Sequence, residues 1–156
     1  MSILLAFIML ISSIGVAKIK NYLPYGLLFK EDLCLLDDAF INYYNIDPLL
    51  VMSVAYVESK WNPLAINKED YGLMQVNKYW LTKYGVTVQQ ALNPFINVQL
   101  ATSILRYCMD RFDNIILALE CYNKGEKMAR RSIYKSLYSK RVLTLYNVFR
   151  MRRFTW

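Results

Sequence analysis

Two dipeptides, Asp47-Pro48 and Asn93-Pro94, mark positions where helices should begin in this chain. An Asp or Asn side chain can accept hydrogen bonds from the free N–H groups of a first helical turn, and proline is well tolerated at the first helical position. Apolar residues with helical spacing follow each dipeptide. The pattern therefore predicts a helix over 48–58 and a longer helix over 94–112.

The rest of the chain supports a mainly helical domain. The segment 61–77 is polar and is interrupted by proline and glycine, which predicts a loop or a small β-ribbon. Asp113 is a candidate N-cap for a short helix over 115–121, which we interpret as wholly apolar and which should stop at the turn 122–125. A final amphipathic helix is expected over 132–149.

The N-terminal segment 3–17 is almost entirely apolar and ends in small residues, which is typical of a signal-peptide core. Lys18 and Lys20 follow this segment, and no Lys or Arg precedes it, so an uncleaved membrane anchor and a buried core helix remain alternatives. We predict a signal peptide or N-terminal membrane anchor over 1–20, one domain over 21–156, and export to the periplasm or cell envelope.

Composition narrows the chemistry that this chain can perform. The sequence contains no histidine, so carboxylates must carry any proton transfer, and the three cysteines show no metal-ligand spacing. We predict neither a cofactor nor a metal. Cys108 and Cys121 fall on apolar helical faces and are interpreted as small buried hydrophobic residues, while a disulfide between any two of the three cysteines, Cys34 included, is left unassigned.

Glu58 closes the first apolar helical run and is the strongest candidate for a proton donor. Apolar surroundings disfavour the charged form of a carboxyl group, so its pKa rises and it can act as a general acid. The alternative is a solvated residue at the end of a helix.

Four motifs follow one another in the order that characterises a known family. They are Glu58-Ser59 with Trp61-Asn62-Pro63, then Gly72-Leu73-Met74-Gln75, then Asn93-Pro94 with Asn97, and finally Tyr122-Asn123 with Gly125. Over about 44–149 the chain resembles the soluble lytic transglycosylase (SLT) domain family of the lysozyme-like superfamily, in the small form that accompanies secretion and conjugation systems. The resemblance implies a mainly α, lysozyme-like α+β fold with a deep substrate groove.

The resemblance also implies the site residues. It makes Glu58 the catalytic acid and then base, and it places the substrate-binding residues at Ser59, Asn67, Met74, Gln75, Tyr122 and Asn123. Gln75 could instead pin its loop through hydrogen bonds to the backbone, and Asn123 could cap a turn. Tyr122 is either a core aromatic residue or a hydroxyl that reaches the cleft and orients Glu58.

The implied reaction is lytic cleavage of peptidoglycan with formation of 1,6-anhydro-MurNAc. Asn77 stands where goose-type lysozymes carry an Asp, and we interpret Glu69 and Asp70 as solvated loop charges, so Glu58 is the one acid in place. Most glycosidases need two carboxylates, and the substrate's own acetamido group can replace the second one. A hydrolytic muramidase is the alternative, and a non-catalytic peptidoglycan-binding module is a third reading.

Peptidoglycan glycan strands are the expected partner. The net charge of +7 suits an anionic partner, and ten Lys and Arg residues against one acid follow Asn123. Their helical spacing among Leu and Tyr does not match a nucleic-acid-binding motif, so we expect no nucleic acid. Secretion, conjugation or phage-tail components are further candidate partners, the N-terminal segment could bind a membrane, and a virion-associated location is the alternative to the envelope.

Overall fold

The computed structural model describes residues 45–131 and 137–153, and for residues 152 and 153 it describes the backbone only. The elements in chain order are α5 (Pro48–Ser59), β1 (Ile66–Asn67), β2 (Asp70–Tyr71), β3 (Val76–Asn77), α6 (Lys78–Tyr84), α7 (Val88–Ala91), α8 (Pro94–Met109), α9 (Ile115–Lys124), α10 (Glu126–Arg131) and α11 (Leu137–Arg153). The prediction of a mainly helical fold with a small β-ribbon is confirmed. The predicted N-terminal segment and Cys34 lie outside the described residues.

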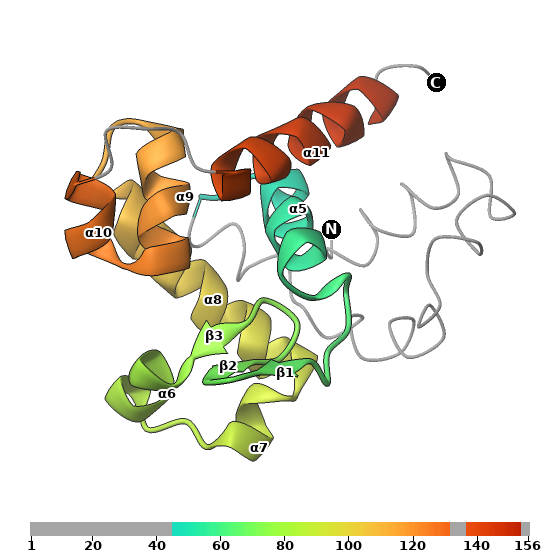
Figure 1. Ribbon diagram of the computed structural model, residues 1–156. Helices are drawn as coiled ribbons and strands as arrows, with labels where there is room; N and C mark the ends of the chain where they lie inside the picture. The colour runs from blue at the N-terminus through green and yellow to red at the C-terminus, as the bar shows by residue number, and fades with distance from the viewer. Residues whose placement is uncertain (1–44, 132–136, 154–156) are drawn as a thin grey trace, which may run out of the picture.

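The elements form two lobes joined by α8 (Figure 1). The antiparallel sheet, in the order β1-β2-β3, lies with α6 and α7 in one lobe, while α9, α10 and α11 lie in the other. α11 packs along α5, and α9 packs against α8, α10 and α11. One core of buried side chains joins the two lobes, with Val54, Met74, Leu105, Leu119 and Val142 at its centre. None of the described helices combines the length and apolar content needed to cross a bilayer.

The two predicted cap-plus-proline starts are confirmed. The Asp47 carboxylate accepts a hydrogen bond from the Leu49 N–H at 2.9 Å at the start of α5. The Asn93 side chain accepts from the N–H groups of the second and third residues of α8. α8 ends at Met109, three residues before the predicted end at Phe112.

The next helix begins at Ile115, as predicted, but the predicted N-cap and the predicted C-terminal end were wrong. Asn114, and not Asp113, caps α9 by accepting a hydrogen bond from the Ile116 N–H at 2.8 Å. The helix continues through Lys124, because Gly125, with φ of 85°, supplies the stop. Tyr122 and Asn123 therefore lie on the last helical turn, where their direction is fixed by the helix and not by a loop.

The interpretation of Cys108 and Cys121 as small buried residues is confirmed, and the disulfide that the sequence left unassigned is the one between them. The two residues are 1% and 4% exposed. α8 and α9 pack side by side and bring the two Cα atoms to 5.7 Å, which is within the usual range for a disulfide. The disulfide thus fastens α9 to α8 at the residue immediately before Tyr122.

α9 is also less apolar than predicted, because it contains Glu120 with a fully buried side chain. Lys124 lies one turn further along the helix, and its Nζ is 2.7 Å from Glu120 Oε2. A buried carboxylate needs such a partner, since an isolated charge in the core is costly.

Candidate active site

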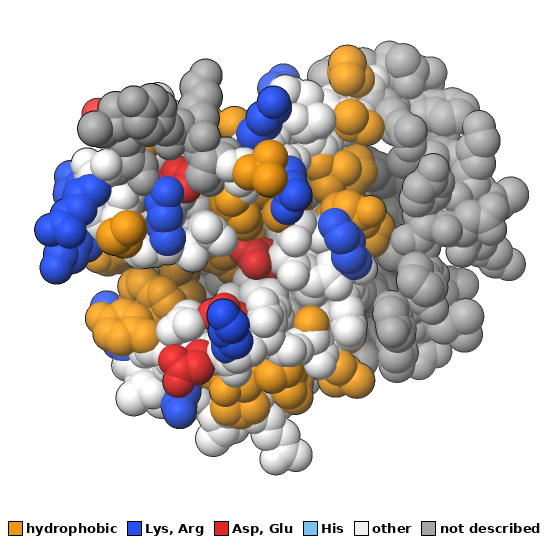
Figure 2. Space-filling view, viewed as in Figure 1, with side chains coloured by type: hydrophobic (Ala, Val, Ile, Leu, Met, Phe, Trp, Pro, Cys, Tyr) orange, Lys and Arg blue, Asp and Glu red, His pale blue; other side chains and the backbone are white. Residues whose placement is uncertain are grey.

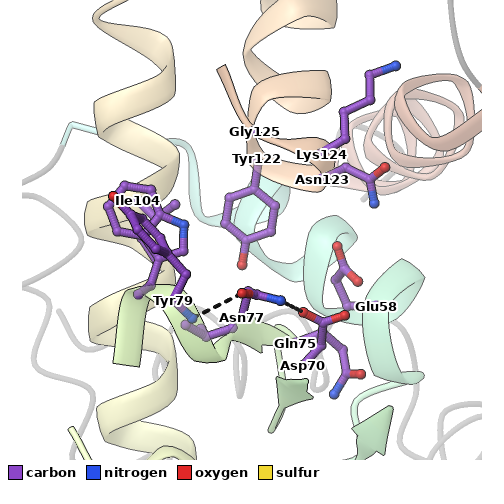
Figure 3. A pocket seen from close by; sticks show the side chains of 12 residues that line it. Glu58, Asp70, Gln75, Asn77, Tyr79, Ile104, Tyr122, Asn123, Lys124 and Gly125 are labelled. Atoms are coloured by element: carbon purple, nitrogen blue, oxygen red, sulfur yellow. Dashed lines mark hydrogen bonds between the residues drawn. The ribbon is translucent and has the colours of Figure 1, made fainter. Parts of the chain in front are cut away.

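A groove of about 370 Å³ opens between the two lobes, and Glu58 lies in it. Its walls are formed by Glu58, Asp70, Gln75, Val76, Asn77, Tyr79, Trp80, Ile104, Tyr122, Asn123, Lys124 and Gly125. Figure 2 shows the hollow with acidic side chains along it, and Figure 3 shows the labelled side chains that converge on it from both lobes. The described residues contain no group of three or more His, Cys, Asp or Glu side chains that could hold a metal ion.

The pKa of the Glu58 carboxyl group lies in the range that a general acid needs near neutral pH. Glu58 stands on the last turn of α5, largely shielded from solvent, and its Oε1 accepts a hydrogen bond from the Tyr138 hydroxyl at 2.7 Å. The pKa of Glu58 is raised to about 7. Burial is the main cause, the Tyr138 hydrogen bond works in the opposite direction, and the charge of Asp70 adds to the rise. A large fraction of Glu58 is therefore protonated near neutral pH.

α11 holds both ends of α5 through two tyrosine hydroxyls. Tyr138 reaches Glu58 at the C-terminal end, and the Tyr146 hydroxyl donates to Asp47 Oδ2 at 2.7 Å at the N-terminal end. The two helices therefore run antiparallel, and α11 supplies a direct hydrogen-bond partner of the Glu58 carboxyl. Tyr138 was not among the predicted site residues, because nothing in the sequence distinguishes it from the other tyrosines of an amphipathic helix.

Tyr138→Phe should move the alkaline limb of the pH–activity profile to higher pH. The lost hydrogen bond stabilised the charged carboxylate, so the pKa of Glu58 should rise, and the protonated form should persist to higher pH. The maximal rate should also fall, by less than the roughly 10²-fold expected for loss of the acid itself. Initial rates of peptidoglycan release measured from pH 4 to pH 9 test this shift.

Tyr146→Phe is the matched control, because it removes an equivalent tyrosine–carboxylate bond on the same helix outside the groove. Tyr146→Phe should leave the alkaline limb of the pH–activity profile unchanged. An unmoved limb in Tyr138→Phe, or an equal shift in the control, would contradict the assigned role of Tyr138.

Asp70 lies in the groove, so its interpretation as a solvated loop charge was wrong. It is half-buried on β2, lines the same pocket as Glu58, and its Oδ1 accepts a hydrogen bond from the Asn77 Nδ2 at 2.8 Å. The register of the sheet pairs Asp70 with Asn77 directly, which fixes the carboxylate against the groove wall. Glu69 is exposed, as predicted, with the Lys78 Nζ at 3.9 Å. The site therefore contains two carboxylates.

Three of the six residues predicted to bind substrate line the groove, and three do not. Gln75, Tyr122 and Asn123 face it together with Glu58 (Figure 3). Ser59, Asn67 and Met74 are not among the lining residues. Met74 is fully buried in the core, and Asn67 is exposed on β1.

Several of the predicted residues hold the groove wall in shape. Gln75 has a positive φ of 51°, and its Nε2 donates to the carbonyls of Ala65 and Gly72 at 3.0 and 2.8 Å. The Ser59 hydroxyl donates to the Leu73 carbonyl at 2.6 Å. The backbone-pinning alternative for Gln75 therefore describes contacts that the structure contains, while the side chain still borders the groove.

The Tyr122 hydroxyl donates to the Met74 carbonyl at 2.8 Å, whereas the hydrogen bond to Glu58 that we expected from Tyr122 comes from Tyr138. Burial raises the pKa of Tyr122 well above its ordinary value, and the charges of Glu58 and Asp70 add to the rise. Tyr122 therefore stays a neutral hydrogen-bond donor at any physiological pH.

The buried Asn97 side chain holds the backbone of the segment 71–75, which includes Gly72 and the groove residue Gln75. This side chain is fully buried, donates to the carbonyls of Tyr71 and Ala91 at 2.8 Å each, and accepts from the Met74 N–H at 2.8 Å. Gly72 has a φ of 79°, and a Cβ at this position would collide with the Asn97 amide and the Ala91 carbonyl. Only glycine fits here, because both its backbone angle and the space exclude a side chain.

The comparison with known proteins decides the family. The family described as "Transglycosylase SLT domain" matches residues 39–141. The chain belongs to this family. It is also 31% identical, over 106 residues, to a protein named "Transglycosylase" from Enterobacteria phage PRD1. That alignment covers 67% of this chain and 39% of the relative, so the chain spans about two fifths of the relative's length. The family inferred from the four ordered motifs is confirmed.

Proposed function

We propose that this SLT-domain protein is a peptidoglycan lytic transglycosylase that cleaves the MurNAc-β-1,4-GlcNAc bond and leaves a 1,6-anhydro-MurNAc end. The observation that carries the proposal is the Glu58 carboxyl at the base of an open groove, with burial raising its pKa to about 7. The family match and the phage transglycosylase support the same reaction class.

The reaction needs a group that first gives and then takes a proton, and Glu58 can do both. In the first step Glu58 protonates the glycosidic oxygen, the bond from C1 of MurNAc to that oxygen breaks, and the MurNAc acetamido oxygen bonds to C1. In the second step the Glu58 carboxylate takes the proton from the MurNAc 6-hydroxyl, O6 bonds to C1, and the bond from the acetamido oxygen to C1 breaks. No water is consumed, and Glu58 ends protonated.

Tyr138 supports this double role. Its hydroxyl donates to Glu58, so the hydrogen bond stabilises the carboxylate formed after the first step. Burial favours the neutral acid before that step. The two opposing effects keep the pKa near the middle of the physiological range, where one group can serve as acid and as base.

Mass spectrometry of the products tests the proposal directly. Purified peptidoglycan digested in water enriched in ¹⁸O should yield muropeptides with 1,6-anhydro ends and without the heavy isotope. Reducing-end products carrying ¹⁸O as the main fraction would establish hydrolysis instead.

The position of Asp70 supports a second candidate function, a hydrolytic muramidase. A second carboxylate beside the general acid is what retaining and inverting glycosidases use to attack carbon or to activate water. Asp70 lines the groove with Glu58 and is held by Asn77, so the chain has a residue for that role.

Asp70→Asn separates the two candidates. In a transglycosylase, activity should fall much less than in Glu58→Gln, and the alkaline limb should move to lower pH, because removal of the Asp70 charge lowers the pKa of Glu58. Rates and pH profiles on the same peptidoglycan measure both effects. A loss as large as that of Glu58→Gln, with the fold intact, would favour the muramidase.

We further propose that the protein acts on the cell wall from outside the cytoplasm, opening it locally for a secretion or conjugation apparatus or for phage entry. The buried Cys108–Cys121 disulfide supports an oxidising compartment, because such bonds are rare in the reducing cytosol. The phage origin of the relative supports the phage role. Fractionation of the producing cells, or of virions, tests the location.

A further inference from the structure

Four aromatic side chains gather at the end of the groove that α6 forms. They are Tyr79, Trp80, Tyr84 and Tyr107. Two of them, Tyr79 and Trp80, line the same groove as Glu58. Figure 3 shows Tyr79 across the groove from Glu58, with Asn77 between them, and Figure 2 shows hydrophobic side chains at the end of the hollow between α10 and α6.

Tyr79 leaves a large aromatic surface in contact with solvent. Tyr79 is 65% exposed, although it lies in the first turn of α6, only two residues after strand β3. Burying apolar surface is favourable, so an exposed aromatic ring on the wall of a pocket indicates a place that a bound ligand would cover. Neither the acid chemistry of Glu58 nor the packing of the core uses this ring.

The cluster behind Tyr79 is packed and therefore rigid. The Trp80 ring meets Tyr79 edge-on at 5.3 Å between centroids, stacks on Tyr84 at 6.0 Å, and meets Tyr107 edge-on at 5.4 Å. The Lys83 Nζ lies 4.7 Å from the centre of the Trp80 ring. Binding of a ligand to this surface would cost little side-chain entropy, because the rings are already held in place by their neighbours.

Asn77 fixes the cluster relative to the reacting end of the groove. Its Oδ1 accepts from the Tyr79 N–H at 3.0 Å at the start of α6, and its Nδ2 donates to Asp70 at 2.8 Å. One side chain thus joins the aromatic end of the groove to the wall that carries Asp70. A ligand unit on Tyr79 would be held in a constant register relative to Glu58.

We propose that Tyr79 and Trp80 form a sugar-binding shelf, an additional subsite that holds a pyranose ring of the glycan strand away from the bond being cleaved. The inference rests on the proposed function, because it assigns a glycan strand to the same groove. In β-1,4-linked aminosugars the ring substituents are equatorial, so the ring faces present C–H groups. Such faces pack on aromatic rings, while the tyrosine hydroxyl remains available to sugar hydroxyls.

Binding measured without cleavage tests the shelf. In the Glu58→Gln background, titration calorimetry with the β-1,4-linked hexamer of N-acetylglucosamine gives the affinity of the groove. Tyr79→Ala should weaken this affinity about three- to tenfold, and Tyr79→Phe should recover most of the loss because it keeps the ring. In the catalytically intact protein, Tyr79→Ala should raise KM for glycan strands more than it lowers kcat.

Leu64→Ala is the matched control, because Leu64 is 63% exposed and does not line the groove. The shelf is overturned if Tyr79→Ala binds the hexamer as tightly as Leu64→Ala does, or if it weakens binding only of strands that carry peptide stems. The proposed function fails separately, if the unmodified protein releases no muropeptides while Tyr79→Ala still weakens hexamer binding.

Discussion

Glu58→Gln should slow the release of muropeptides from purified peptidoglycan by roughly 10²- to 10⁴-fold. Gln has nearly the same shape as Glu and can accept the Tyr138 hydrogen bond, but it has no proton of suitable acidity to give. Glycan binding should therefore survive while turnover collapses. Turbidity loss of peptidoglycan suspensions measures the rate, and binding of the inactive variant to the same suspension measures recognition.

The same variant gives a second readout in stability, and its sign follows from the pKa. The folded state raises the pKa of Glu58 from 4.5 to about 7, so folding favours the protonated form. This contribution to the free energy of unfolding is fully present below pH 4.5 and is lost as the pH rises through 7. The unmodified protein should thus lose up to about 3 kcal/mol across this window that Glu58→Gln does not lose.

Glu69→Gln is the control for both measurements. Glu69 lies in the turn between β1 and β2, is exposed, and is absent from the groove wall. Its substitution should change the rate less than twofold and leave the pH dependence of stability as it is. If Glu58→Gln retained the rate of this control, Glu58 would not be the acid, and the enzymatic assignment would fall with it.

The helical framework could be predicted from local sequence because its signals are local. Asp47 and Asn93 each cap a helix through their own side chain a few residues ahead, and proline follows at the first helical position. The N-cap of α9 was mispredicted for a related reason, although its first residue was predicted correctly. Asp113 and Asn114 are both good caps, and only the path of the chain between α8 and α9 decides between them.

The disulfide and the second carboxylate could not be predicted, because both depend on how distant segments meet. Cys108 and Cys121 are brought together by the packing of α8 on α9. Asp70 faces the groove because the β2–β3 register places it opposite Asn77. In the sequence, Glu69 and Asp70 are two neighbouring charges in a polar segment, a pattern that a solvated turn also shows.

The contact between Tyr138 and Glu58 also could not be predicted from local sequence, because it joins two distant segments. Tyr138 is 80 residues from Glu58 in the chain, and its hydrogen bond exists because α11 lies antiparallel to α5. The motifs singled out Glu58 as the candidate acid, since that residue type at that place is distinctive. They did not identify the group that adjusts its pKa, since a tyrosine on an amphipathic helix has no distinctive pattern.

The largest effect on folding is expected at Asn97, whose side chain connects three backbone groups that are otherwise remote. The Leu side chain has the same number and branching of heavy atoms as Asn, so Asn97→Leu would keep the core filled. It would leave the carbonyls of Tyr71 and Ala91 and the N–H of Met74 without this partner. Each unsatisfied buried polar group costs about 1–3 kcal/mol, so the variant should lose roughly 3 kcal/mol or more of its free energy of unfolding.

Asn93→Ala provides the matched comparison for Asn97→Leu, because Asn93 lies on the same helix one turn earlier and is exposed. Its loss removes a helix cap and should cost only about 1 kcal/mol. Urea unfolding followed by circular dichroism measures both variants. Equal losses would mean that Asn97 is not the anchor of the groove wall. A larger loss in Asn97→Leu, together with impaired glycan binding where that variant is still folded, would show that the segment carrying Gln75 depends on this one buried amide.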